Sequence, residues 1–243
     1  MKIAVIGGTG LIGSQVVKKL DAAGHDAVPL SPSTGVDLIT GQGLTEAVAG
    51  ADVVVNLTNS PTFDDASPAF FQTSMDNMLS ASREGGAGHA VILSIVGVDL
   101  VPDLAYYRAK TLQEDILKAG PIPYSIVRAT QFMEFIQPTL AMTTEGDTVR
   151  LPSTPVQPVA AQDVSDLVAE VAAGPPLNGT VNIAGPDVHP LDELGRITLN
   201  ARPDGRSVVT DESAGMFAAA RGDVLLPPAD ARIALTRYRD WLA

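Results

Sequence analysis

Tyr106 and Lys110 are the side chains whose types and spacing best suit chemistry. They stand four residues apart, so on a helix they would share one face. A phenol with a pKa of about 10 exchanges protons poorly at neutral pH, and a nearby ammonium favours the phenolate and lowers that pKa. The pair therefore predicts a proton donor and acceptor, Tyr106, assisted by Lys110. The alternative is a core tyrosine beside a solvated lysine.

Three glycines near the N-terminus indicate a binding site for a dinucleotide. Gly7, Gly10 and Gly13 follow an apolar run, Ile3–Ile6, and open an amphipathic segment, Leu11–Ala22. In such a strand–loop–helix unit the first glycine permits a tight turn, the second lets the backbone approach a pyrophosphate, and the third lets helix and sheet pack closely. The alternative is an ordinary glycine-rich turn.

The elements that must position these residues alternate along the chain. Short, nearly continuous apolar runs predict buried parallel strands, and longer segments between them predict helices, so the fold class is α/β, a doubly wound parallel sheet of Rossmann type. After Arg128, Pro152–Pro158 is predicted to be a loop. The chain is predicted to be one domain, residues 1–243, in which residues 131–243 cover the substrate. The predicted strands are Ile3–Ile6, Ala27–Leu30, Val53–Leu57, Ala90–Ser94, Tyr124–Arg128, Thr148–Leu151 and Thr180–Ile183; the predicted helices are Leu11–Ala22, Leu44–Ala49, Ala69–Glu84, Leu104–Ala119, Gln162–Ala172 and Leu191–Leu199.

Composition excludes several classes of function. A net charge of −12 argues against a nucleic-acid or anionic membrane surface. The absence of cysteine excludes disulfides and thiolate metal sites, and the three histidines lie far apart, so no metal site is expected. No apolar run approaches the ~20 residues of a membrane helix. We expect a cytoplasmic monomer or homodimer whose partner is a small-molecule substrate.

Several motifs together carry a resemblance to a known family. They are Gly-Gly-Thr-Gly-Leu-Ile-Gly at 7–13, Val36-Asp37-Leu38, the run 53–58, Tyr106-x-x-x-Lys110, the run 124–132 and Asn182-Ile183-Ala184-Gly185-Pro186. The chain resembles the NmrA-like atypical short-chain dehydrogenases/reductases nearly end to end. The resemblance implies that the protein binds NAD(P)H and that Tyr106 exchanges a proton with a carbonyl oxygen while hydride moves to or from its carbon.

The resemblance also implies roles for individual residues. Asp37 would contact the adenine amino group, Lys110 the nicotinamide ribose, and Tyr107 is assigned to packing or to a substrate wall. Ser94 stands where the superfamily has the first serine of a pair, and Ile95 replaces the second, which is often catalytic. Ser94 is therefore the third catalytic candidate, as a donor to the substrate carbonyl; the alternative is that Tyr106 alone or another group stabilises that oxygen. The remaining predicted cofactor contacts are Gly7, Thr9, Gly10, Leu11, Ile12, Gly13, Leu38, Asn56, Leu57, Thr58, Ala129 and Thr130, and the predicted substrate contacts are Phe132 and Met133.

The end of the second strand bears on the choice of cofactor. An acidic residue there selects NAD and an arginine nearby selects NADP, but the run Ser31–Gly35 has neither. Without a carboxylate to repel a 2′-phosphate, and with Ser31 and Ser33 able to donate hydrogen bonds to it, NADP is favoured over NAD.

Three functions are compatible with these residues. The favoured one is an NAD(P)H-dependent oxidoreductase that transfers hydride to an apolar carbonyl, quinone or related acceptor. The second is a sensor that holds NADP(H) without turnover, because the serine pattern is incomplete and the family's arginine is missing. The third, a nucleotide-sugar epimerase, is disfavoured because such enzymes are expected to carry a larger C-terminal domain.

Overall fold

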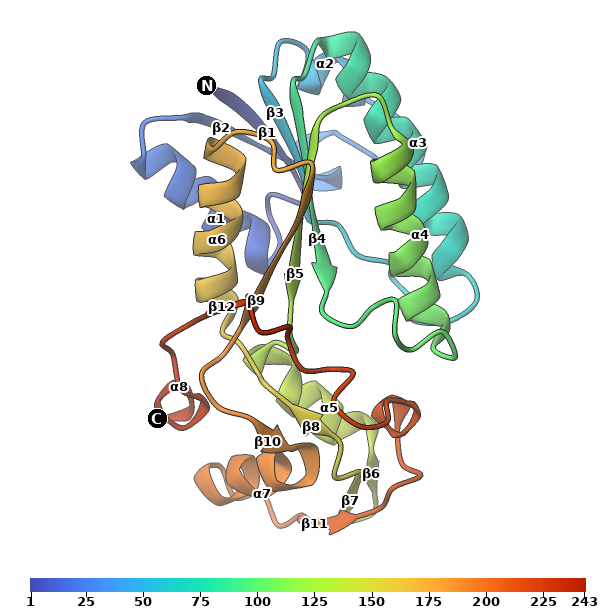
Figure 1. The fold of residues 1–243 in the computed structure, drawn as a ribbon, viewed down its shortest axis with the longest axis vertical. Helices are drawn as coiled ribbons and strands as arrows, with labels where there is room; N and C mark the ends of the chain where they lie inside the picture. The colour runs from blue at the N-terminus through green and yellow to red at the C-terminus, as the bar shows by residue number, and fades with distance from the viewer. The chain divides into compact units, whose positions relative to one another are not determined.

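The computed structural model describes residues 1–243, which form two compact units (Figure 1). Unit 1 comprises Met1–Ser94, Ala105–Arg128 and Val164–Val181. Unit 2 comprises Ile95–Leu104, Ala129–Asp163 and Asn182–Ala243. No helix has both the length and the apolar character required to cross a membrane.

Unit 1 contains most of a parallel sheet, in which its strands are ordered β9-β5-β4-β3-β1-β2. The registers place Ile3 of β1 between Ala27 of β2 and Val53 of β3. The strand order reverses between β1 and β3, and ligands of open α/β sheets bind at the carboxyl ends of the strands at such a point. The strands are β1 (Lys2–Ile6), β2 (Asp26–Leu30), β3 (Val53–Asn56), β4 (His89–Ile95), β5 (Tyr124–Ala129) and β9 (Gly179–Ala184).

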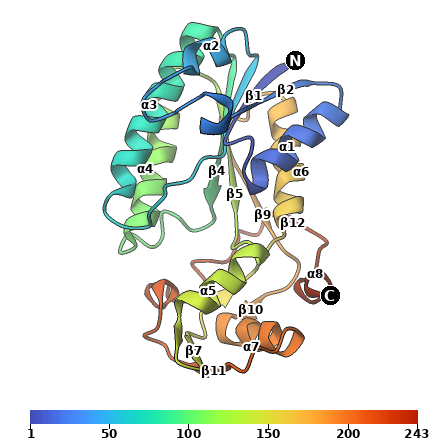
Figure 2. The ribbon, with the colours of Figure 1, turned by 180° about the vertical axis from the view of Figure 1, so that it is seen from behind.

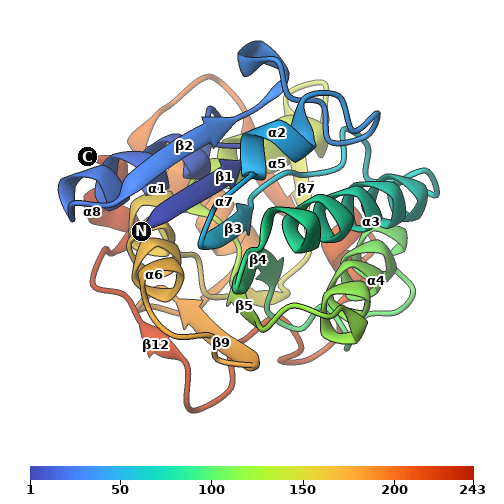
Figure 3. The ribbon, with the colours of Figure 1, turned by 90° about the horizontal axis from the view of Figure 1, so that it is seen from above.

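Helices cover both faces of this sheet, as the view from above shows (Figure 3). One face carries α1 (Leu11–Ala22) and α6 (Ala161–Ala173), and the other carries α2 (Leu44–Val48), α3 (Ser67–Gly85) and α4 (Ala105–Ala119). The central strands β1, β3, β4 and β5 are almost fully buried because apolar side chains project from both faces. A large cluster that includes Ile6, Val54, Met78, Ile92 and Leu117 fills the space beneath α2–α4.

Unit 2 contains a small mixed sheet and several helices (Figure 2). Strand β7 (Thr148–Leu151) pairs in parallel with β11 (Ser207–Thr210) and antiparallel with β6 (Thr144–Glu145). Helix α7 (Leu191–Ala201) packs tightly on this sheet, since a Cβ at Gly195 would lie 2.7 Å from a Leu151 methyl carbon. The other elements are α5 (Ile136–Met142), β8 (Pro155–Val156), β10 (His189–Pro190), β12 (Arg232–Ile233) and α8 (Tyr238–Leu242), with short 3-10 turns at Pro32–Thr34, Met133–Phe135 and Met216–Ala219.

The predicted α/β fold is confirmed, with two local corrections. The amphipathic pattern of 11–22 puts Leu11 with Ile12 and Val16 on the buried stripe of α1, but Leu11 is half exposed because it lies in the first turn, at the open edge of the sheet. The segment Pro152–Pro158 is not wholly a loop, because β8 forms within it and pairs with β10.

Candidate active site

The glycine loop between β1 and α1 has the geometry that its spacing predicts. Gly7 has a φ of +79°, a conformation that side chains rarely adopt. A Cβ at Gly13 would lie 2.1 Å from the Gly7 carbonyl oxygen, so α1 can approach the loop only with glycine at this position. Gly8 is equally constrained, although the motif spacing did not single it out: its Cβ would lie 2.6 Å from the Val5 carbonyl oxygen.

The N-terminus of α1 fits a pyrophosphate. Gly10 is its N-cap, no side chain caps the helix, and its first turn holds no acidic residue. The first backbone N–H groups of a helix lack partners inside it and attract anions. Thr9, Gly10 and Leu11 are exposed beside them, while Ile12 and Gly13 are buried.

The segment after β3 packs against the glycine loop. A Cβ at Gly7 would lie 3.0 Å from the Leu57 carbonyl carbon and 3.2 Å from the Thr58 nitrogen. Asn56 is buried, and its Oδ1 accepts hydrogen bonds from the Thr58 N–H at 3.0 Å and the Thr58 hydroxyl at 2.6 Å. Asn56 therefore shapes the turn, and the turn brings Leu57 and Thr58 beside Gly7 at the carboxyl edge of the sheet.

The predicted adenosine contacts lie after β2, the edge strand of the sheet. Asp37 is partly exposed, and its Oδ1 accepts the N–H groups of Ile39 at 2.8 Å and Thr40 at 3.0 Å. These bonds lower the pKa of Asp37, so the carboxylate stays ionised. Leu38 is buried. The contact of Asp37 with adenine stays a prediction. The hydrogen bonds of the turn already occupy Oδ1 of the Asp37 carboxylate.

Ser31 and Ser33 lie together directly after β2. Their hydroxyl oxygens are 2.8 Å apart. The Thr34 hydroxyl accepts a hydrogen bond from the Ser31 N–H and donates one to the Ser31 carbonyl oxygen, which fixes the turn. Ser31 is buried and Ser33 is exposed. Two hydroxyls held at one point can turn their protons toward an anionic oxygen.

Tyr106, on the first turn of α4, bonds to a residue that the sequence did not reveal. Its hydroxyl donates to Asn59 Oδ1 at 2.5 Å. Phe63 meets the Tyr106 ring edge-on, with centroids 4.8 Å apart, and the centroid of the Phe71 ring lies 6.4 Å from that of Tyr106. Burial raises the pKa of Tyr106 to about 12, and the bond to Asn59 opposes only part of that rise. The expectation of a lowered pKa is therefore wrong.

Lys110 does not contribute to the pKa shift of Tyr106, which comes from burial and from the bond to Asn59. Lys110 Nζ donates to the Leu93 carbonyl oxygen at 2.7 Å and to Gln113 Oε1, and it lies 5.0 Å from the centre of the Phe71 ring. The side chain is buried. Burial lowers the pKa of Lys110 to about 7, and nearby Glu114 opposes part of that fall. These two bonds use two of the three N–H donors of the ammonium, and a ribose hydroxyl would take the third.

Ser94, at the end of β4, is engaged by a buried carboxylate. Its hydroxyl donates to Glu114 Oε1 at 2.6 Å. Arg128 of β5 binds the same carboxylate through Nε at 2.8 Å and Nη2 at 2.7 Å, and Lys118 donates to it at 3.0 Å. Burial raises the pKa of Glu114, but these bonds outweigh burial and hold the pKa below its usual value.

This carboxylate could have been found from the sequence. Tyr106, Lys110 and Glu114 recur at intervals of four on α4, so they share a face. Asn59 gave no such signal, because it lies in a loop 47 residues before Tyr106. Tyr107 is buried, in keeping with packing.

The remaining predicted contacts lie in unit 2. Ala129 and Thr130 are buried, and Thr130 is fixed by its N–H, which donates to the Ile183 carbonyl at 3.0 Å, and its hydroxyl, which donates to the Gln157 carbonyl at 2.5 Å. Met133 is buried and Phe132 half-buried. Between them and Thr130, both amide atoms of Gln131 are buried without a hydrogen-bond partner. Their contacts to cofactor and substrate stay predictions.

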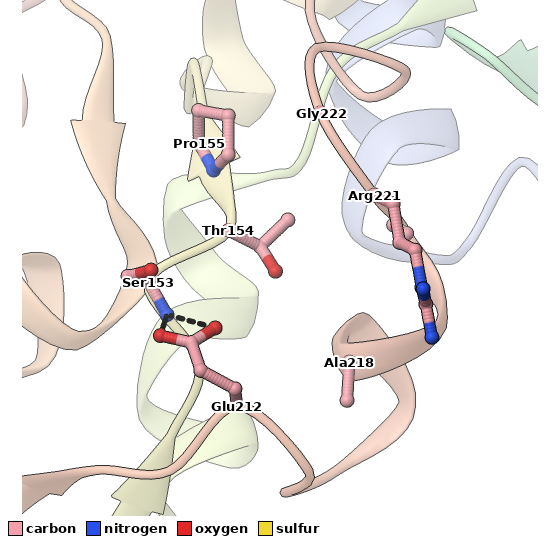
Figure 4. Close-up of a pocket in the computed structure, with 8 residues that line it drawn as sticks. Ser153, Thr154, Pro155, Glu212, Ala218, Arg221 and Gly222 are labelled. Carbon is pink, nitrogen blue, oxygen red and sulfur yellow. Dashed lines mark hydrogen bonds between the residues drawn. The ribbon is translucent and has the colours of Figure 1, made fainter.

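Unit 2 also holds two pockets. One, of about 320 Å³, is lined by Thr154, Glu212 and Arg221 among others (Figure 4). The Glu212 carboxylate lies against the Ser153 N–H, and Arg221 stands across the pocket. The other, of about 260 Å³, has a largely apolar lining that includes Met142, Leu151, Met216 and Phe217. None of the predicted substrate residues lines either pocket. No group of three histidine or carboxylate side chains that could hold a metal ion occurs.

Comparison with known proteins places this arrangement among NAD(P)H-binding proteins. Residues 7–175 match the family model described as NAD(P)H-binding. The curated relatives include an isoflavone reductase homolog from Nicotiana tabacum, 26% identical over 167 residues, or 57% of this chain and 51% of that protein. The match thus spans about half the length of the curated relative.

Solved structures agree in fold. Citrobacter sp. triphenylmethane reductase complexed with NADP(H) is 20% identical, with a TM-score of 0.67 over 87% of this chain and 79% of that chain. Escherichia coli NADPH-dependent quinone oxidoreductase QOR2, complexed with NADPH, is 18% identical, with a TM-score of 0.69 over 86% of this chain and 77% of that chain.

A third structure corrects one argument from the sequence. A nucleoside-diphosphate-sugar epimerase from Staphylococcus aureus is 15% identical, with a TM-score of 0.71 over 100% of this chain and 99% of that chain. The small size of this chain is therefore no argument against that class. At such identities the likeness establishes the fold alone, whereas the family match covers well over half of the chain. This chain belongs to the NAD(P)H-binding family, as its resemblance to the NmrA-like atypical short-chain dehydrogenases/reductases implied.

Proposed function

We propose that the protein is an NADP(H)-preferring oxidoreductase that reduces an apolar carbonyl, quinone or related small acceptor. One observation carries the proposal: Tyr106 donates to Asn59, the residue that follows the Leu57–Thr58 backbone packed against Gly7. The Tyr106 phenol is thus held at the carboxyl edge of the sheet. It is linked through Asn59 to the 57–58 backbone, which lies beside the glycine loop. Phe63 supplies an exposed apolar surface beside the phenol.

The raised pKa of Tyr106 favours the reductive direction. A phenol with a pKa of about 12 stays protonated at neutral pH, so it can give a proton to a developing alkoxide but is a poor base for oxidising an alcohol. The α1 N-terminus would hold the pyrophosphate, and Ser31 and Ser33 would donate to a 2′-phosphate. Contacts of Ala129, Thr130, Phe132 and Met133 with nicotinamide or substrate are part of the proposal.

The test measures binding and turnover separately. NADPH and NADH are titrated by fluorescence, and loss of the reduced nicotinamide absorbance is then followed with quinones, aldehydes and ketones. We expect Tyr106→Phe to retain NADPH affinity and to lower turnover by about 10²-fold or more, the usual contribution of a positioned acid. Equal turnover by wild type and Tyr106→Phe would contradict the assignment of the proton donor.

A second function has an observation of its own. Ser94 and Lys110 are both held by internal hydrogen bonds, which suits a protein that binds NADP(H) without chemistry. Tight NADPH binding with no turnover of any acceptor would favour this sensor. Failure to bind either nucleotide would rule out both functions.

A further inference from the structure

The proposed reduction needs a hydrogen-bond donor that the predicted residues do not supply. Negative charge develops on the acceptor oxygen as hydride adds, and donors directed at that oxygen stabilise it. Ser94 was the candidate, but its hydroxyl proton is held by Glu114 Oε1 at 2.6 Å in a buried network. Because Arg128 and Lys118 fix that carboxylate, Ser94 cannot readily turn toward a substrate.

Asn59 presents an unused donor at the required place. Its Oδ1 accepts two hydrogen bonds, one from the Ser60 N–H at 3.0 Å and one from the Tyr106 hydroxyl at 2.5 Å. Since only the oxygen of an amide can accept from a backbone N–H, the orientation of the side chain is set, and Nδ2 is the free end. The side chain of Asn59 is exposed, so a ligand can reach that end.

We propose that Asn59 Nδ2 donates a hydrogen bond to the substrate oxygen that Tyr106 protonates. Oδ1 and Nδ2 are bonded to one carbon, so a single acceptor oxygen can lie within reach of both Nδ2 and the Tyr106 hydroxyl. Asn59 then stabilises the developing alkoxide in place of Ser94, and Phe63 faces the apolar part of the same molecule. The inference rests on the proposed function.

The step uses only the acceptor, the reduced nicotinamide and a proton from water. The carbonyl carbon accepts a hydride from the reduced nicotinamide, and the C=O π pair moves onto oxygen. The O–H bond of Tyr106 breaks, its proton passes to that oxygen, and water reprotonates the phenolate. Asn59 donates a hydrogen bond throughout and transfers no proton. Before the step, the Tyr106 hydroxyl exchanges Asn59 Oδ1 for the substrate oxygen as its acceptor.

Asn59→Asp separates this role from a structural one. The aspartate keeps an oxygen for the Ser60 N–H and the Tyr106 hydroxyl but has no N–H to donate. Asn59→Ala removes both functions without adding charge. Asn200→Asp, at an exposed position on α7, controls for the added charge. Each variant is compared with wild type and Tyr106→Phe for kcat, KM, NADPH affinity and thermal stability.

We expect both Asn59 variants to lower kcat at least tenfold, toward the ~10²-fold that loss of one oxyanion donor costs. NADPH affinity and thermal stability should stay close to wild type, and Asn200→Asp should behave as wild type. Retention of kcat within twofold by either Asn59 variant, in an enzyme that Tyr106→Phe inactivates, overturns the inference and leaves the proposed function intact. Absence of turnover in wild type overturns the proposed function itself.

Discussion

Replacing Lys110 with methionine should stabilise the folded protein at neutral pH while impairing its function. Methionine has similar length and no charge, so it can occupy the same buried space. The wild-type ammonium has a pKa lowered from 10.5 to about 7, because burial disfavours its charged form. A shift of one pKa unit corresponds to about 1.4 kcal/mol, so the charge of Lys110 costs the folded state about 4 kcal/mol at pH 7.

Part of that gain is offset in the variant. The Leu93 carbonyl and Gln113 Oε1 lose their donor, at about 1–3 kcal/mol in all. We therefore expect the free energy of unfolding of Lys110→Met at pH 7 to exceed that of wild type by about 1–3 kcal/mol, so the variant is the more stable protein. Nicotinamide-dependent turnover should fall, a pattern typical of residues retained for function at the expense of stability.

The pH dependence gives a sharper test. Between about pH 7 and 10.5 the unfolded state binds one more proton at Lys110 than the folded state, so wild-type stability rises with pH through this window. The advantage of Lys110→Met should thus shrink by about 3 kcal/mol between pH 7 and about pH 9.5, measured by urea unfolding. Lys18→Met, at an exposed position on α1, is the control and should show no such change.

Two results would refute this reasoning. A variant less stable than wild type at both pH values would mean that the Lys110 hydrogen bonds outweigh the burial of its charge. A stability difference independent of pH would mean that Lys110 has no lowered pKa in the folded protein.

Three further predictions concern the glycine loop, the buried network and the choice of cofactor. Gly13→Ala should weaken NADPH binding more than tenfold in a fluorescence titration, because its Cβ would lie 2.1 Å from the Gly7 carbonyl oxygen; unchanged affinity would show that the loop does not hold the cofactor. Ser94→Ala should leave kcat within about threefold but lower the unfolding free energy by about 1–3 kcal/mol, since Glu114 loses a buried donor; a large loss of kcat at normal stability would return a catalytic role to Ser94. Ser33→Asp should shift preference from NADPH toward NADH at least tenfold in kcat/KM, because a carboxylate repels a 2′-phosphate; an unaltered ratio would place the adenosine elsewhere.

The sequence predicted the elements of unit 1 well because their signals are local. Helix α1 has the predicted bounds, Leu11–Ala22, since a glycine loop starts it and a glycine follows it. The five strands from β1 to β5 match the predictions within a residue or two at each end, because each is a compact apolar run. Strands of two residues such as β8 and β10 escaped prediction, because two residues show no periodicity.

The site was predictable only where its residues share one element. Spacing on α4 correctly suggested that Tyr106 and Lys110 share a face, but it could not show where their polar atoms find partners. Those partners, Asn59 and the Leu93 carbonyl, come from distant parts of unit 1. The prediction that the pKa of Tyr106 is lowered was wrong for the same reason: the rise comes from burial, which is a property of the folded chain.

The network of Ser94, Glu114 and Arg128 ties α4 to β4 and β5, and it makes each of the three side chains depend on the other two. Loss of Glu114 alone would strand the guanidinium of Arg128, and loss of Arg128 alone would strand a buried carboxylate. Tolerated replacements at these positions should therefore be correlated among homologues, with apolar residues entering at two or three positions together. A serine conserved at the end of this strand could then be retained because it anchors α4. Its conservation alone would therefore be weak evidence of catalysis.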